Sequence, residues 1–575
     1  MNHLITFLKS KKGMLGVIFL VTLMQVFGIL LVPFFVAQII NVGIMEKDID
    51  TILWIGLEML AAAGITALIS LWSSYLCADL ASLTGKHMRE LIFDKTQYLS
   101  VSEFNQFGTA SMITRATGDI TIIQQTMIMI TQLILPTPLI AVAAVVMTGM
   151  VSMELVYIPL AAMVIFMILI LVLFKKASPV SRTIQTRVDR VNRIVRESVV
   201  GVRVIRAFDN TSYEQKRSDD TFVAYADNVI HLNRIFAMFN PMVWAIMGIT
   251  MVAVVWFGGY LVLQATTQIG SIMAVMQYTV IILMFLMMSA MVIVMVPRMI
   301  ACLERISEVL DTAPEIADDR EAVASPSVKG SKLIVFNDVS FSYQGAEEPV
   351  LRNLSFCCEA GKTTAIIGGT GSGKSTIAAL MLRLYDIQEG QILVAGNDIR
   401  RMTQHDLRES ISYVPQKAFL FSGTIAENLR TGKPDATDAD LRQAVKIAQA
   451  EAFITTLEAG YQSPVAQGGS NFSGGQKQRL CIARALVKKA PIYIFDDSFS
   501  ALDYQTDAAL RSELKLAMKD ACLIVVAQRI SSIMDADQII VLDNGSIAGI
   551  GRHEELLRDC SLYREIADSQ VKREG

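Results

Sequence analysis

A glycine-rich segment, Gly368-Gly-Thr-Gly-Ser-Gly-Lys-Ser375, has the residue types and spacing of a loop that binds phosphate. Glycines let successive backbone N–H groups curl around phosphate oxygens at the start of a helix, where the helix dipole also favours an anion. A strand at Thr363–Ile367 and a helix at Thr376–Leu384 are predicted on either side, which disfavours the alternative of an ordinary glycine-rich turn. The predicted phosphate contacts are Gly368, Gly369, Thr370, Gly371, Ser372, Gly373, Lys374, Ser375 and Thr376.

Within this loop, two side chains would act directly on a nucleotide. Lys374 is expected to reach the β- and γ-phosphates, and Ser375 to ligate Mg²⁺. A second candidate metal ligand is Asp496, which ends the apolar run Ile492-Tyr-Ile-Phe-Asp496. Many core strands end in Asp, so this motif gains its weight from the phosphate loop. A carboxylate at the C-terminal edge of a strand beside such a loop is suited to hold the Mg²⁺ shell.

The order of motifs carries a family resemblance. Asn471-Phe-Ser-Gly-Gly-Gln-Lys-Gln-Arg479 resembles the LSGGQ signature of ATP-binding-cassette (ABC) ATPases, with Phe472 at the Leu position. The phosphate loop, Tyr-Val-Pro-Gln416, this signature, Asp496 and Ser-Ala-Leu-Asp503 follow one another as they do in that family, over the whole C-terminal part. The resemblance implies that ATP and Mg²⁺ are the ligands.

The resemblance also implies roles for further residues. Gln416 would join Ser375 and Asp496 at the metal, and Asp503 would belong to the catalytic set. Tyr343 would stack on adenine, the alternative being a strand aromatic in the core. In the family two cassettes pack head to tail, so that each ATP lies between one phosphate loop and the other cassette's signature. The signature residues offered to a partner's site would be Ser473, Gly474, Gly475 and Gln476.

Two positions depart from the family pattern. Asp497 stands where hydrolytic cassettes have a Glu that polarises the attacking water, and it is one methylene shorter, although a base must come within about 2.6–3.2 Å of its water. Gln528, in Ala527-Gln-Arg529, stands where the family has a switch His. A glutamine side chain donates hydrogen bonds but carries no positive charge.

Both departures affect the site that contains this chain's own phosphate loop, whereas the signature is intact. The pattern predicts weak or absent hydrolysis at this chain's site, together with ATP binding. It resembles the degenerate subunit of bacterial heterodimeric ABC exporters. The expected partner is therefore a second, different half-transporter that supplies the Glu and the His.

The N-terminal half is predicted to cross a bilayer six times. The 575-residue chain has only 18% charged residues and a mean hydropathy of +0.45, and a transmembrane helix needs about 20 apolar residues. Such runs recur along the first 297 residues, and the longest is divided by a polar break at Gln264–Ser271. They are Gly13–Met45, Met59–Ala78, Ile120–Met153, Leu155–Phe174 and the divided block Ile235–Pro297.

Basic residues indicate the orientation. The segments between spans two and three and between spans four and five are rich in Lys and Arg, whereas the opposite connections carry only Lys47. The positive-inside rule therefore predicts that both termini and the ATP-binding domain are cytoplasmic. With the resemblance, this indicates a multi-pass protein of the bacterial inner membrane.

The predicted fold is an α-helical six-span transmembrane domain fused to an α/β ABC domain. The boundaries expected are 1–311 for the helical domain, 312–331 for a Pro-, Ala- and Ser-rich linker and 332–575 for the nucleotide-binding domain. Short β-branched runs alternating with helical stretches indicate a largely parallel sheet. The predicted strands are Lys332–Phe336, Thr363–Ile367, Gln391–Val394, Ile411–Val414, Ile492–Phe495, Leu523–Val526 and Ile539–Leu542.

The cargo is the part of the function that the sequence specifies least. A methionine-rich sixth span could adapt to varied apolar compounds, or its methionines could simply pack or face lipid. A small amphipathic, drug- or lipid-like substrate fits the near absence of charge within the spans. The net charge of −3 gives no sign of nucleic-acid binding. Two alternatives to export stay open: a regulatory or channel-like subunit that uses ATP binding as a switch, and an importer with an exporter-like fold.

Overall fold

The computed structural model describes residues 2–293, 295–318 and 332–574, and it divides into two compact units. The first unit comprises Met1–Gln97 and Thr109–Thr312. The second comprises Ala313–Gly575 together with the distant segment Tyr98–Gly108. Most of the predicted linker, from residue 319 to residue 331, lies outside the described residues.

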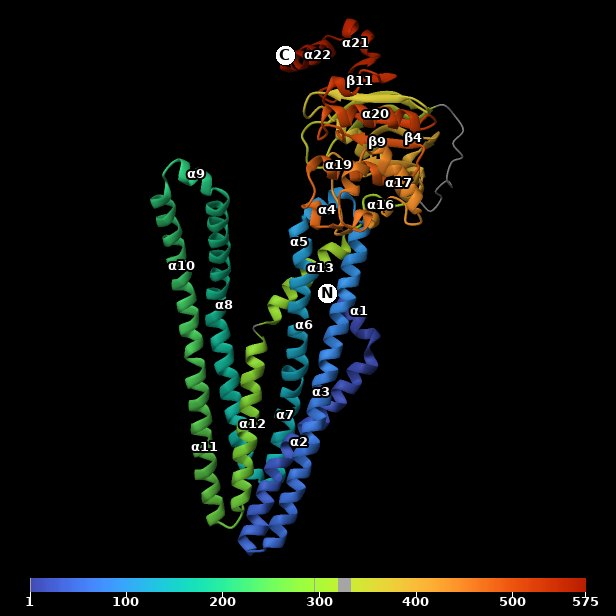
Figure 1. Ribbon diagram of the computed structural model, residues 1–575. Coiled ribbons are helices and arrows are strands. Elements are labelled where there is room, and N and C mark those ends of the chain that lie inside the picture. Colours follow the sequence, from blue (N-terminus) through green and yellow to red (C-terminus); the bar gives the residue numbers. More distant parts are fainter. Residues whose placement is uncertain (1, 294, 319–331, 575) are drawn as a thin grey trace. The chain divides into compact units, whose positions relative to one another are not determined.

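The first unit is built from long helices (Figure 1). Among the residues that the structure describes, six helical stretches are long and apolar enough to cross a membrane, which confirms the six predicted spans. Each stretch is 33 to 53 residues long, whereas about 20 residues cross the hydrocarbon layer, so the helices extend beyond a bilayer. The stretches are Lys12–Ile44, Ile49–Tyr98, Thr109–Val151, Met153–Val200, Thr211–Leu263 and Ile269–Asp311.

Several of these stretches are composed of more than one helix. A π-helical turn ends the first stretch, two such turns interrupt the third, and Pro136 begins a new helix in the third. The helices of this unit are α1 (Asn2–Ser10), α2 (Lys12–Gln38), α3 (Ile49–Tyr98), α5 (Thr109–Thr114), α6 (Ile120–Met129), α7 (Pro136–Val151), α8 (Tyr157–Val200), α9 (Val202–Ala207), α10 (Thr211–Ala237), α11 (Phe239–Leu263), α12 (Ile269–Ile293) and α13 (Val296–Asp311).

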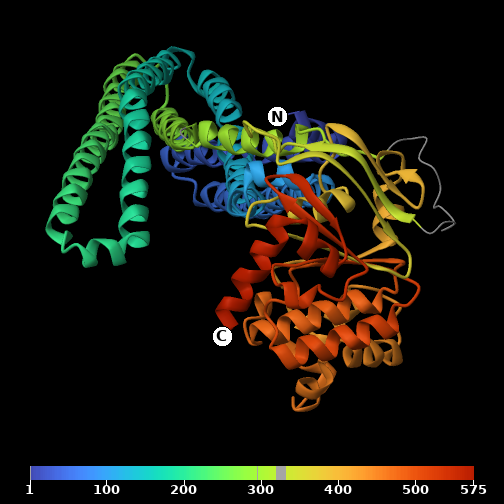
Figure 2. The same ribbon diagram turned by 90° about the horizontal axis from the view of Figure 1, so that it is seen from above.

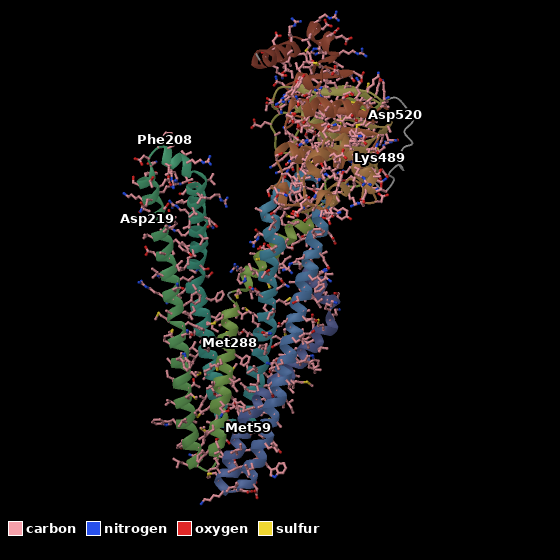
Figure 3. All side chains as sticks on the ribbon, viewed as in Figure 1. Met59, Phe208, Asp219, Met288, Lys489 and Asp520 are labelled. Atoms are coloured by element: carbon pink, nitrogen blue, oxygen red, sulfur yellow. The ribbon has the colours of Figure 1, made fainter. Side chains whose placement is uncertain are left out.

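Helices α8 and α10 lie side by side, and α9 joins them at one end of the unit (Figures 1 and 2). This end exposes apolar side chains: Phe208 is 80% exposed and Val204 is 60% exposed. Phe208 marks the tip in Figure 3. An exposed apolar tip on a charged helical pair is typical of a surface that contacts another protein.

An ion-pair network ties the third stretch to the last one. Arg305 of α13 donates two hydrogen bonds to the carboxylate of Asp119, at 2.8 and 2.6 Å, and Asp119 is only 2% exposed. Arg115 donates to the backbone oxygen of Arg305 and to Glu308, both at 2.9 Å. Because a buried carboxylate is costly without a partner, these contacts fix α13 against the π-helical turn Arg115–Asp119.

The described part of the second unit contains a six-stranded sheet, a separate four-stranded sheet and a two-stranded sheet of β7 and β8. In the larger sheet the strand order is β12-β11-β3-β10-β9-β6, parallel except for β12 at its edge. The smaller sheet is antiparallel, in the order β2-β1-β4-β5. The strands are β1 (Lys332–Phe341), β2 (Leu351–Glu359), β3 (Thr363–Gly368), β4 (Glu389–Val394), β5 (Asn397–Asp398), β6 (Ile411–Val414), β7 (Gly423–Thr424), β8 (Pro464–Val465), β9 (Ile492–Asp496), β10 (Cys522–Val526), β11 (Gln538–Asp543) and β12 (Ser546–Gly551).

All seven predicted strands are present, but the expectation of one largely parallel sheet needs correction. The runs that begin at Lys332 and Gln391 form β1 and β4, which pair antiparallel with each other in the smaller sheet. Their β-branched residues predicted a strand correctly. Alternation within a run says nothing about its partner, because pairing is decided by tertiary packing.

Helices surround these sheets and include one from far away in the sequence. Helix α4 (Val101–Phe107) belongs to the second unit. Its Glu103 is 8% exposed and accepts a 2.6 Å hydrogen bond from the backbone N–H of Glu315. The other helices are α14 (Lys374–Met381), α15 (Gln404–Glu409), α16 (Ile425–Arg430), α17 (Asp438–Ile447), α18 (Glu451–Thr455), α19 (Gly474–Val487), α20 (Tyr504–Ala517), α21 (His553–Asp559) and α22 (Ser561–Glu574).

Candidate nucleotide-binding site

The phosphate loop connects the central strand β3 to the N-terminus of α14. Gly371 and Gly373 have φ values of +81° and +95°, in the left-handed region that favours glycine. A Cβ on Gly373 would also collide with the side chain of Leu351. A Cβ on Gly369 or Gly371 would meet no heavy atom within 4 Å, so the space beside these two residues is open. The loop therefore presents backbone amides to an open space at a helix N-terminus, which suits an anion.

Lys374 occupies this loop in the way a phosphate-binding lysine should. Its ammonium donates hydrogen bonds to the backbone oxygens of Gly368 and Gly369, at 2.9 and 2.7 Å. The side chain is buried, and this burial lowers the pKa of Lys374 below its ordinary value. A third hydrogen bond, of 3.5 Å, goes to the Ser372 hydroxyl. The partners of this buried cation among the described residues are thus neutral oxygens, and a nucleotide phosphate would supply a countercharge at contact distance.

The sheet register brings Asp496 next to the phosphate loop. Strand β10 lies between β3 and β9, and its Val526 pairs with both Ile366 and Asp496. Ser375 donates a 3.0 Å hydrogen bond from Oγ to Oδ1 of Asp496, and the Tyr413 hydroxyl donates to Oδ2 at 3.4 Å. Asp496 is 3% exposed, and burial raises its pKa. A hydroxyl and a carboxylate oxygen 3.0 Å apart are a suitable ligand pair for Mg²⁺.

Asp497 lies at the centre of a small polar cluster. It follows β9 with a φ of +47°, in the left-handed region that few non-glycine residues adopt. Oδ2 accepts hydrogen bonds from the amides of Gln416 at 3.2 Å and Gln528 at 2.8 Å. Burial raises the pKa of Asp497, while the Gln416 and Ser500 hydrogen bonds and the charges of Lys374 and Arg529 oppose this rise. Three predicted site residues, 416, 497 and 528, thus meet through one carboxylate oxygen.

A residue that the sequence did not reveal holds the loop of Gln528. Gln570 of α22 donates a 2.7 Å hydrogen bond to the backbone oxygen of Gln528 and accepts one of 2.8 Å from the backbone N–H of Ile530. Arg511 of α20 donates to the backbone oxygen of Ser531 at 3.0 Å. Both residues lie in ordinary amphipathic helices, so no sequence motif pointed to them.

Tyr343 lies beside the start of α14. Its hydroxyl is 3.0 Å from the hydroxyl of Thr376, and its ring meets those of Phe341 and Tyr385 edge-on. The ring is partly buried against the core of the smaller sheet. This packing agrees with the alternative of a strand aromatic at the core, and the stacking of Tyr343 on adenine stays a prediction.

The signature residues form a helix cap. Ser473 precedes α19, and its Oγ accepts the backbone N–H of Gln476 at 3.3 Å. The Gln476 side chain in turn accepts the backbone N–H of Ser473 at 2.9 Å. This capping box leaves the first-turn amides of Gly474 and Gly475 without intrahelical acceptors. The contacts of Ser473 and Gln476 are thus mutual, and the free amides suit an anion brought from outside.

Asp503 also caps a helix, α20. Its carboxylate accepts the backbone N–H of Thr506 at 2.9 Å and the Thr506 hydroxyl at 2.7 Å. These two hydrogen bonds lower the pKa of Asp503. Its predicted place in a catalytic set stays a prediction, because in this structure its hydrogen bonds serve the helix start.

Comparison with known proteins decides the family. A family model described as ABC transporter matches residues 351–500, and one described as ABC transporter transmembrane region matches residues 15–302. The chain belongs to the ABC transporter family. It is an ABC exporter half-transporter, with one transmembrane domain fused to one nucleotide-binding domain.

Relatives of this ABC exporter cover its full length. An uncharacterized ABC transporter ATP-binding protein of Mycobacterium tuberculosis (strain CDC 1551 / Oshkosh) is 36% identical over 98% of this chain and 97% of the relative. An ATP-dependent lipid A-core flippase of Syntrophus aciditrophicus is 29% identical over 92% and 88%. A solved structure of a bacterial Atm1-family ABC exporter with ATP bound has a TM-score of 0.80 and 26% identity, covering 97% of this chain and 98% of that one.

Proposed function

We propose that this ABC exporter chain is one subunit of a heterodimer, in which its own site retains ATP and its signature completes the partner's catalytic site. The observation that carries the proposal is the pairing at Asp497. The carboxylate at the position of the catalytic base accepts two neutral amide donors on one oxygen. Gln528, which stands at the position of the switch residue, supplies one of these donors.

The short side chain of Asp497 and the hydrogen bonds that it already accepts argue against efficient hydrolysis. A raised pKa by itself would suit a general base. However, the side chain is one methylene shorter than glutamate, and its Oδ2 is already an acceptor for Gln416 and Gln528. A water would have to displace a hydrogen bond and approach a base that stands further back. Loss of correct base placement typically costs about 10²–10⁴-fold in rate.

Gln528 weakens the site in a second way. Its amide nitrogen donates to Asp497 at 2.8 Å and bears no charge. A neutral amide can donate one hydrogen bond to a γ-phosphate, but it stabilises developing negative charge less than a cationic donor does, because charge-assisted hydrogen bonds are about twice as strong. Both departures are therefore expected to lower the rate of ATP hydrolysis more than the affinity for ATP.

Binding of Mg²⁺–ATP fits the remaining residues. Lys374 and the amides of the phosphate loop would hold the phosphates, while Ser375 and Asp496 would ligate the metal. Gln416 would complete the metal shell after releasing Asp497. Mg²⁺ held by these residues would supply positive charge next to the phosphates, and the chain's own residues would keep the nucleotide in place.

The intact signature explains why the partner should differ from this chain. A homodimer would contain two identical sites, each with Asp497 and Gln528. Ser473 and the Gly474 amide would then serve only impaired sites. A partner that carries Glu and His would instead give one productive site, completed by this chain's signature.

The decisive measurement is the ATPase rate of this chain alone and with a candidate partner, in lipid nanodiscs. We expect low activity from the lone chain and robust activity from the pair. The Ser473→Ala variant should lower the activity of the pair by about tenfold or more, because it removes the signature cap at the productive site. Robust hydrolysis by the lone chain would contradict the proposal.

We further propose export of amphipathic, drug- or lipid-like compounds from the cytoplasmic side of the bacterial inner membrane. In α12, Met284, Met288 and Met291 expose 45%, 41% and 58% of their surface, and Met288 is labelled in Figure 3. Methionines of this kind adapt to varied apolar ligands. The similarity to a lipid A-core flippase supports a lipid-like cargo. ATP-dependent movement of a fluorescent lipid across vesicles containing the pair tests export, and its absence would favour a regulatory role.

A further inference from the structure

The C-terminal helix α22 holds the loop that carries Gln528 through hydrogen bonds to its backbone. This loop, residues 527–532, follows β10. Its first anchor is the backbone N–H of Ala527, which donates to the oxygen of Ile366 in β3 at 3.0 Å. The other anchors are side chains of two helices, Arg511 of α20 and Gln570 of α22. The loop is therefore attached to the sheet at its start and to helices further along.

Both polar atoms of the Gln570 side-chain amide form hydrogen bonds to this loop. Its Nε2 donates to the backbone oxygen of Gln528 at 2.7 Å, and its Oε1 accepts the backbone N–H of Ile530 at 2.8 Å. These two backbone groups flank Arg529. Two hydrogen bonds from one planar amide restrict the orientation of the backbone between them more than one bond could, because both distances must be satisfied together.

The packing of α22 against the core positions Gln570 next to the loop. Helix α22 buries Tyr563 completely and Ala567 to 9% exposure, and Ile566 packs against the same core. Tyr563, Ile566, Ala567 and Gln570 follow the spacing i, i+3, i+4, i+7, which puts them on one face of the helix. Ile530 belongs to the same core cluster as Tyr563. The apolar residues of this face thus anchor α22 in the core. Gln570, the last of the four residues, hydrogen-bonds the loop.

From these contacts we infer that Gln570 is a positioning residue of the nucleotide site. It fixes the backbone of Gln528, so that the side chain of this residue points to Asp497. The chain of contacts runs from α22 through Gln570 to Gln528 and from Gln528 to Asp497. This inference deepens the proposed function and rests on it for the nucleotide that the site retains.

The expected consequence is slower release of nucleotide. A site whose groups are already ordered loses less conformational freedom when it binds a ligand. Without Gln570, the 527–532 loop would have to be ordered at the moment of binding. We expect the Gln570→Leu variant to release a fluorescent ATP analogue about three- to tenfold faster, the range that corresponds to the loss of one ordinary hydrogen bond.

Hydrogen exchange of the Ile530 amide tests the contact directly, because this N–H donates to Gln570. In the full-length protein in nanodiscs, Gln570→Leu should lower the protection of Ile530 by about tenfold while Ala527, which donates to Ile366, keeps its protection. Gln570→Glu retains the acceptor for Ile530 but loses the donor to Gln528. It should therefore preserve the protection of Ile530 and still accelerate nucleotide release.

Ser569→Ala is the matched control, because the side chain of Ser569 hydrogen-bonds within its own helix, to the oxygen of Ile566, and to no other described residue. It should change neither exchange at Ile530 nor nucleotide release. Unchanged exchange in Gln570→Leu would overturn the contact, and changed exchange with unchanged release would overturn the positioning role. The ATPase rate of the lone chain tests the proposed function separately, since robust hydrolysis would leave the exchange result at Ile530 unaffected.

Discussion

The side-chain amide of Gln528 donates a 2.8 Å hydrogen bond to Oδ2 of Asp497. These two residues are 31 positions apart and stand where the ABC resemblance leads us to expect the catalytic Glu and the switch His. Their direct contact means that each departure affects the other. A glutamate and a histidine at these places would form a charge-assisted pair, whereas the observed pair has one neutral member.

This contact predicts that hydrolysis is restored by the double variant Asp497→Glu with Gln528→His. Either single change should have a small effect, because one member of the pair would still be unsuited to catalysis. The double variant should raise the ATPase rate of the lone chain by about 10²-fold, a lower value of what a positioned base contributes. A double variant no faster than the parent would show that the rate is limited elsewhere.

The raised pKa of Asp496 predicts that this carboxylate lowers the stability of the metal-free fold at neutral pH, although metal binding requires it. The folded state holds this carboxyl at a pKa above its ordinary value, so its burial as an anion costs stability at neutral pH. Asp496→Asn should therefore raise the unfolding temperature of the nucleotide-free protein at pH 7. This advantage should shrink as the pH falls below the raised pKa, because the wild-type carboxyl then becomes neutral. Scanning calorimetry against pH gives the measurement.

The same protonation should weaken binding of Mg²⁺–ATP as the pH falls. The decline should begin at a higher pH than for an aspartate with an ordinary pKa of about 3.9. In Asp496→Asn the affinity should be low at every pH and should lose its dependence on Mg²⁺. Nucleotide fluorescence titrations with and without Mg²⁺ would show this, and retained Mg²⁺ dependence in the variant would remove Asp496 from the metal shell.

Glycine at position 373 should be required for two separable reasons. Gly373 has a φ of +95°, and a Cβ there would collide with Leu351. Gly396 has a similar φ of +86° with no neighbour within 4 Å of a Cβ. Gly396→Ala should cost about 1–2 kcal/mol from backbone strain alone, and Gly373→Ala should cost more. Chemical unfolding of both variants gives the comparison, and equal losses would contradict the steric contribution of Leu351.

The pair Asp119–Arg305 should stabilise the transmembrane unit. Asp119→Asn removes the partner of Arg305, whose side chain is 47% exposed. We therefore expect a loss of about 1–2 kcal/mol, below the 3–5 kcal/mol typical of a fully buried pair. Asp219→Asn, at an exposed aspartate of α10 (Figure 3), is the control and should be neutral. Thermal unfolding in detergent compares the two, and equal midpoints would show that the pair contributes nothing.

Much of the site could be predicted from local sequence. The spacing of glycines in the phosphate loop, the six apolar stretches and the strand that ends at Asp496 all depend on residues close together in the chain. Backbone conformation and helix or strand periodicity are local properties, which explains why these predictions could be made without a structure. The two departures at Asp497 and Gln528 were also visible, because they occupy fixed places in a motif order.

Tertiary structure alone decided which distant residues meet. The runs at Lys332 and Gln391 predicted strands but not their separate antiparallel sheet, since a strand's own pattern does not name its partner. Asp503 lies in a recognised motif, yet its present hydrogen bonds cap α20. Gln570 carries no motif, and it reaches the loop of Gln528 across 42 positions only because the apolar face of α22 packs against the same core as Ile530.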